Sequence, residues 1–107
     1  MRQELIESVK KVVKEEREAA ASIHPLFHST HEGYAVILEE LDEARDALCN
    51  IELQQRRLWD NVKKDNFPSR DQSFVEVGYL EKAAINLACE AIQIAAMAEK
   101  FIESVKR

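Results

Sequence analysis

The chain has 107 residues and a net charge of −5, with 46% hydrophobic and 33% charged residues. This composition is that of one folded domain, spanning residues 1–107, and not of a disordered chain. An acidic chain without a concentrated basic face is not expected to bind a nucleic acid polymer, although a free nucleotide could bind where a cation neutralises its phosphates.

The first expected helix spans Gln3–Ala21, where apolar residues recur every three or four positions. It is charged and lacks the apolar core of a signal peptide, so we expect a cytoplasmic protein. The pattern breaks at SIHPLFHST, around Pro25. His24, His28 and His31 are spaced by four and three residues in this region. Pro25 and the helix start predicted after it place the first two outside a helix, which favours loop or interface positions over a metal site.

The second expected helix begins at a capping box, Ser29-Thr30-His31-Glu32. It ends at KDNFPSRDQS, because Pro68 cannot continue a helix. The third helix is expected from about Gln72 to Val105. Both helices carry apolar seams whose spacing alternates between four and three residues. The expected seams consist of Ile37, Leu41, Ala44, Leu48, Ile51, Gln55, Leu58 and Val62 in the second helix, and of Val77, Leu80, Ala84, Leu87, Ala91, Ile94, Ala98, Phe101 and Val105 in the third.

Two long helices joined by a short turn pack antiparallel, so we expect an all-α antiparallel bundle. The third helix is also apolar outside its seam, and a chain of this length has too little other material to cover it. We therefore expect a homo-oligomer, a dimer or tetramer, with this helix at its centre. The apolar tract 83–98 is too short to cross a bilayer, so no membrane partner is expected. Cys49 and Cys89 have no metal-type spacing and are expected to be reduced.

An acidic cluster, EELDE, occupies residues 39–43 of the second helix. Each helical residue turns the side chain by about 100°, so Glu40 and Glu43 lie on one side of the seam, beside small and apolar residues. Glu39 and Asp42 point elsewhere and are expected to face solvent. The cluster therefore directs two of its carboxylates towards a partly enclosed position.

The third helix carries a polar stripe that is expected to face this cluster. Between residues 83 and 98 the polar residues are Asn86, Glu90 and Gln93, and their spacing places them on one face. If the turn is centred near Phe67-Pro68, the numbers of residues at the same level sum to roughly 135, because both helices rise equally. This register brings four side chains together: Glu40, Glu43, Glu90 and Gln93.

Clustered carboxylates repel one another and lose hydration when they are enclosed, so proteins rarely keep them without a compensating cation. Oxygen ligands favour Mg²⁺, with Mn²⁺ as the alternative. The four side chains therefore predict a metal site. Two other interpretations stay open: acidic runs on helices are usually solvated, and a polar stripe can fix the register of an oligomer.

These motifs resemble those of the MazG-like all-α nucleoside triphosphate pyrophosphohydrolases, which pair Glu-Glu-x-x-Glu with a later Glu-x-x-Asp. Here Glu39-Glu40-x-x-Glu43 is followed by Glu90-x-x-Gln93, and the resemblance covers residues 30–105. It implies that Glu40, Glu43 and Glu90 are Mg²⁺ ligands. It also implies that the chain forms dimers or tetramers and converts nucleoside triphosphates to monophosphates and pyrophosphate. Gln93 stands where the family has its last Asp, and the gap between the motifs is longer than is common.

The neutral Gln93 leaves three possibilities: a weaker site, a site with fewer ions, or a catalytically inactive relative that binds a nucleotide or a protein. A plain coiled-coil adaptor is a further alternative. In an active enzyme, Glu39 or Glu43 would orient or deprotonate the attacking water. The candidate substrate-binding residues are Lys82 and Lys100 for the phosphates, Tyr34, Trp59, Phe27 and His31 for the base, and Asn86 of the polar stripe.

Overall fold

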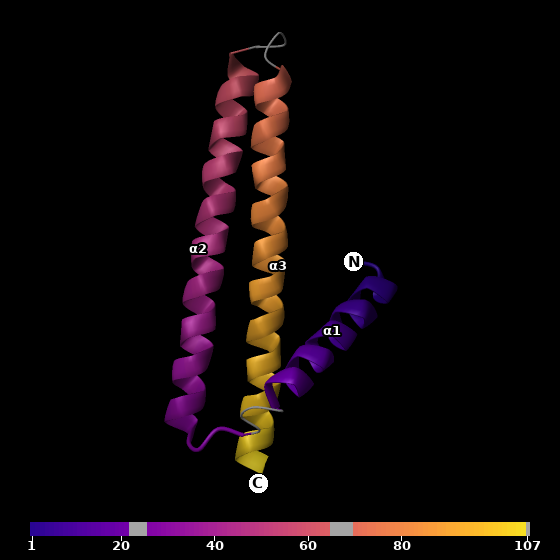
Figure 1. Ribbon diagram of the computed structural model, residues 1–107, viewed down its shortest axis with the longest axis vertical. Coiled ribbons are helices and arrows are strands. Elements are labelled where there is room, and N and C mark those ends of the chain that lie inside the picture. Colours follow the sequence, from indigo (N-terminus) through magenta and orange to yellow (C-terminus); the bar gives the residue numbers. More distant parts are fainter. Residues whose placement is uncertain (22–25, 65–69, 107) are drawn as a thin grey trace.

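The computed structural model is all-helical, which confirms the predicted fold class (Figure 1). It describes residues 1–21, 26–64 and 70–106, without the side chains of 70–74. Helix α1 spans Gln3–Ala21, α2 spans Thr30–Lys63 and α3 spans Arg70–Lys106, and no strand occurs within the described ranges. The predicted breaks at Pro25 and Phe67-Pro68, together with His24, lie outside these ranges.

Helix α2 begins at the predicted cap. Ser29 has an extended backbone, and its Oγ accepts a hydrogen bond of 3.1 Å from the N–H of Glu32. The Glu32 carboxylate accepts a longer hydrogen bond, 3.5 Å, from the N–H of His28, one residue further back than a capping box requires. These contacts provide partners for amides at the start of a helix that have none within it.

The two long helices lie side by side and run in opposite directions along the molecule, as Figure 1 shows. Helix α1 packs against the C-terminal part of α3, and its N-terminal end points away from the pair (Figure 1). The molecule measures 61 × 30 × 22 Å, and its radius of gyration is 18.3 Å. A compact chain of this length would have a radius of gyration of about 13 Å, so the fold is markedly elongated.

The main core lies where α1 packs against the C-terminal part of α3, and residues of α2 border it. Its buried members are Val13, Phe27, Ala96 and Met97. The partly buried residues packed around them are Ala20, Val36, Ile37, Ile92, Ala95 and Phe101. Burial of these side chains fixes the C-terminal part of α1 against α3.

The faces by which α2 and α3 meet are rotated from the predicted seams. Ala44, expected in the seam, is buried in α2, and so are Gly33, Ala47 and Gln54, which were not. Leu48 and Val62, both expected in the seam, are exposed. The same shift occurs in α3, where residues 76 and 83 are buried and residues 77 and 105, also expected in the seam, are exposed. The prediction was wrong at these positions: the buried residue lies one position before the one that the seam predicted.

The reason for the rotation is the size of the residues on the contact face. Small residues at positions 33, 44 and 47 let α3 approach α2 closely, and the ring of Phe101 fills the space beside Gly33. The larger side chains then lie on a flank of the pair. The apolar stripes are wider than one neighbouring helix can cover, so periodicity alone did not identify which part of each stripe packs.

Candidate metal centre

Three carboxylates converge between α2 and α3. Glu40 and Glu43 lie one turn apart on α2, and Glu90 lies opposite them on α3. One carboxylate oxygen from each lies within 4.8 Å of the other two. Glu40 and Glu90 are half-buried and Glu43 is exposed, so the group is open to solvent on one side. Its members are three of the four residues that the sequence predicted as metal ligands.

Two of the three carboxyl groups, those of Glu40 and Glu43, have raised pKa values. Burial, followed by the nearby charges of Glu43 and Glu90, raises the pKa of Glu40 above its ordinary value of 4.5. A hydrogen bond with Glu90 and the charge of that residue raise the pKa of Glu43 in the same way. A hydrogen bond between two carboxyl groups requires a shared proton, so the group retains a proton more readily than isolated carboxylates would.

The donor set of the three glutamates fits a hard cation. Each ionised carboxylate offers only acceptor oxygens, and Oε2 of Glu90 is buried without a hydrogen-bond partner among the described residues. A divalent cation would offset the repulsion among the carboxylates and would provide a partner for this oxygen. Glu40, Glu43 and Glu90 are therefore the residues that could hold Mg²⁺ or Mn²⁺.

Gln93 is directed to α1. Its Nε2 donates a hydrogen bond of 2.7 Å to Oε1 of Glu16. The sequence predicted Gln93 as the fourth ligand, and it did not single out Glu16, which lies within the run Glu15-Glu16-Arg17-Glu18. The packing of α1 against α3 depends on tertiary contacts that no local spacing encodes, so this partner of Gln93 was missed.

The predicted substrate-binding residues of α3 lie at different places along the helix. Asn86 and Lys82 are exposed, about 6 and 12 Å before Glu90 along the helix. Lys100 lies about 15 Å beyond Glu90, is only 6% exposed, and its Nζ lies over the ring of Phe27 at 4.3 Å from the ring centre. Burial, and then the charge of Arg17, lowers the pKa of Lys100. Lys100 is therefore a core residue in this structure and does not reach the carboxylates.

The predicted aromatic contacts are also dispersed. Tyr34 and Trp59 are exposed on α2, and Trp59 lies below the Nζ of Lys63, about 24 Å from Glu43 along the helix. Phe27 is buried in the core, and His31 is exposed near the start of α2. The structure does not bring these four side chains to the carboxylates.

The two other acidic residues of the cluster, Glu39 and Asp42, are exposed, as predicted.

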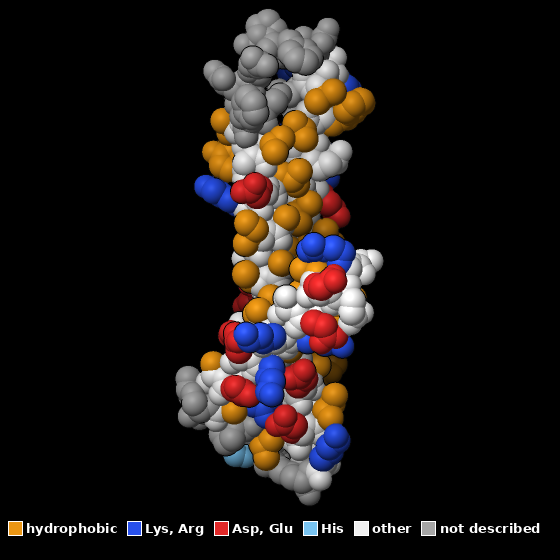
Figure 2. Space-filling view, turned by 90° about the vertical axis from the view of Figure 1, so that its right-hand side faces the viewer, with side chains coloured by type: hydrophobic (Ala, Val, Ile, Leu, Met, Phe, Trp, Pro, Cys, Tyr) orange, Lys and Arg blue, Asp and Glu red, His pale blue; other side chains and the backbone are white. Residues whose placement is uncertain are grey.

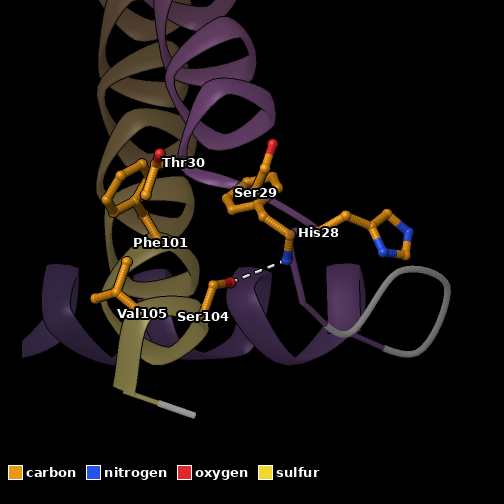
Figure 3. Close-up of a pocket in the computed structure, with 7 residues that line it drawn as sticks. His28, Ser29, Thr30, Phe101, Ser104 and Val105 are labelled. Atoms are coloured by element: carbon orange, nitrogen blue, oxygen red, sulfur yellow. Dashed lines mark hydrogen bonds between the residues drawn. The ribbon is translucent and has the colours of Figure 1, made fainter.

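A separate cavity of about 340 Å³ lies between the start of α2 and the end of α3 (Figure 3). Its lining includes His28, Thr30, Phe101 and Val105. The N–H of Phe27 donates a hydrogen bond of 2.9 Å to Oγ of Ser104, shown as a dashed line, and the His28 ring points away from the other labelled side chains (Figure 3). The lining contains no carboxylate, so this cavity is not part of the metal centre.

Comparisons with known proteins give no relative: no protein-family model, no curated protein and no solved structure matches the chain. The resemblance to the MazG-like family therefore rests on the two motifs and stays a prediction.

No helix in the described parts of the chain is long and apolar enough to cross a membrane. Cys49 and Cys89 are both free and exposed.

Proposed function

We propose that the chain is a Mg²⁺-dependent nucleoside triphosphate pyrophosphohydrolase that acts as a homo-oligomer. The single observation that supports this most strongly is the convergence of Glu40, Glu43 and Glu90, whose carboxylate oxygens lie within 4.8 Å of one another. They come from two helices, and Glu43 and Glu90 are 47 residues apart in the sequence, which a solvated acidic run would not require. The resemblance of the two motifs to those of the MazG-like family suggests the reaction, the hydrolysis of nucleoside triphosphates to monophosphates and pyrophosphate.

The chain's own residues would act in two ways. Half-buried Glu40 and Glu90, together with Glu43, would hold the cation between the helices. Glu43 is exposed, and the raised pKa of its carboxyl group favours acceptance of a proton from the attacking water. Exposed Glu39, on the same turn as Glu40, is the alternative base. Bound Mg²⁺ would neutralise charge on the phosphates and align them for in-line attack.

A second function, that of a catalytically inactive nucleotide- or protein-binding module, is favoured by Gln93. This residue lacks the charge of the family's Asp, and its amide nitrogen is directed to Glu16. A cation held by three carboxylates is bound more weakly than one held by four. In this alternative the centre binds a metal–nucleotide complex without turnover.

Release of pyrophosphate from a panel of ribo- and deoxynucleoside triphosphates, with Mg²⁺ or Mn²⁺, tests the proposal. We expect metal-dependent release, and we expect Glu43→Ala to lower it by more than the roughly 10–100-fold that losing an outer partner of a metal ligand costs. Glu52→Ala, an exposed glutamate on the same helix, is the matched control and should retain activity.

Absence of release from every triphosphate, in a folded protein, would reject the enzyme and leave the binding module. Calorimetric titration with Mg²⁺ and a triphosphate would then detect binding that Glu43→Ala abolishes. Gln93→Asp restores the family's charge and should convert such a binding protein towards activity. If neither metal nor nucleotide binds, the adaptor remains.

A further inference from the structure

The pair of long helices has an uncovered apolar flank. Leu48 is 45% exposed on α2 and Ile102 is 50% exposed on α3, and Val62, Val77 and Val105 are exposed with them. We call these five residues the apolar flank. At 100° per residue, all five lie on one side of the line along which α2 and α3 meet. Glu43 and Gln93 lie on the other side.

The flank is almost free of charge along α3. The residues of α3 that point to this side between residues 77 and 105 are valine, leucine, isoleucine and alanine, and the intervening charged residues Glu81 and Glu99 fall beyond its edge. Figure 2, which looks onto α3 from the side away from α2, shows hydrophobic side chains along the part of α3 above α1, whereas charged side chains gather over α1 itself. A surface of this kind on a monomer usually marks an interaction site.

The chain exposes more surface than a compact monomer of the same mass, and the difference can be compared with the area that a partner covers. The chain exposes 7916 Å², whereas a compact monomer of 12.3 kDa would expose about 6100 Å². The excess is about 1800 Å², and a stable interface covers about 800 Å² of each partner. The single chain therefore carries more surplus surface than one standard interface needs.

The small core indicates that the folded chain needs this partner for its stability. Among the described residues the buried hydrophobic side chains are Val13, Phe27, Ala44, Ala47, Ala83, Ala96 and Met97, four of them alanines, and no large side chain is completely buried. Long helices depend on tertiary packing for most of their stability. A partner that the fold itself requires has to be present whenever the chain is made, and a second copy meets that condition.

We propose that a second copy of this chain covers the apolar flank, so that two helix pairs form a four-helix bundle about a twofold axis. The same residues then lie on both sides of the interface, as twofold symmetry requires. Because Glu43 lies on the opposite side of each pair, the two carboxylate groups face outwards from the bundle. This arrangement names the face by which the proposed homo-oligomer forms; it is independent of the proposed hydrolysis and holds equally for an inactive chain.

Sedimentation and radical footprinting of the unmodified chain test the proposal without a variant that could fail to fold. We expect a species of two or more chains at micromolar concentration. Hydroxyl radicals should oxidise Leu48 and Ile102 several-fold more slowly than their exposure in the single chain predicts. Leu53, 36% exposed and about 140° around α2 from Leu48, is the internal control and should react at its full rate.

The variants Leu48→Lys and Ile102→Lys should raise the dissociation constant at least a hundredfold, whereas Leu53→Lys should leave it unchanged. A single-chain species at every concentration, with Leu48 freely oxidised, would overturn the proposal and assign the flank to another partner. An oligomer in which Leu48 and Ile102 stay reactive would overturn it as well, because the second copy would then cover a different face. The pyrophosphate-release assay tests the hydrolase separately, whichever result these experiments give.

Discussion

Among individual residues, Glu40 shows how the carboxylate group affects stability. Its pKa is raised by burial and by Glu43 and Glu90. An acid with a raised pKa in the folded state stabilises the fold while it is protonated, below pH 4.5, and this contribution is lost as the pH rises through the raised value. We therefore expect Glu40→Gln to raise the midpoint of thermal unfolding at pH 7 by about 3 °C, which corresponds to roughly half a kcal/mol. Below pH 4.5 the variant and the parent should converge.

Circular dichroism melts between pH 4 and pH 8, without divalent cations, would measure this difference. Glu52→Gln is the control, because it removes the same charge from an exposed position of α2 outside the carboxylate group. A Glu40→Gln variant that is less stable than the parent at pH 7 would contradict the inferred repulsion. It would indicate that the carboxylate has a favourable partner.

The carboxylate group could be predicted from the sequence because its geometry depends on helix rise and one turn position. Glu40, Glu43 and Glu90 follow from 100° per residue and from a register that needed only Pro68. The surroundings of Gln93 and Lys100 could not be predicted in this way. Both contact partners from outside the helix pair, Glu16 in α1 and Phe27 before α2, and the positions of these partners depend on the whole core.

At the level of helices, two glycines test how closely α2 and α3 pack. A Cβ atom on Gly33 would lie 2.8 Å from Cε2 of Phe101 and 3.1 Å from Cδ2 of Phe27, within a core that has little room to adjust. We expect Gly33→Ala to lower the free energy of unfolding by about 1–3 kcal/mol, the usual cost of overpacking. This loss should exceed any gain in helix propensity.

Gly78→Ala is the matched control in α3, because among the described residues no atom beyond its own stretch of helix backbone lies within 4 Å of the added Cβ. Only the helix propensity then changes, and we expect a gain of up to about 1 kcal/mol. Urea denaturation of both variants gives the two signs directly. Equal stabilisation by both alanines would show that α2 and α3 do not approach closely at Gly33.

The helices themselves were easier to predict than their contacts. The ends of α1 and the cap of α2 follow from local signals, an apolar period and the Ser29 side chain. The packed face did not follow, because a stripe that alternates four and three residues can pack in two registers one residue apart. The small residues at 33, 44 and 47 selected the register that turns Leu48 to the flank.

For the whole molecule, the stability of the fold should depend on chain concentration. If a second copy covers the apolar flank, unfolding separates two chains, and each tenfold increase in concentration adds about 1.4 kcal/mol per pair. For about 214 unfolding residues this raises the thermal midpoint by about 3 °C per tenfold step. Calorimetry from 5 to 500 µM would measure the slope, and Leu48→Lys should lower the midpoint and reduce the slope. A midpoint that is constant over this range would mean that the 61 Å helix pair is stable with its flank uncovered.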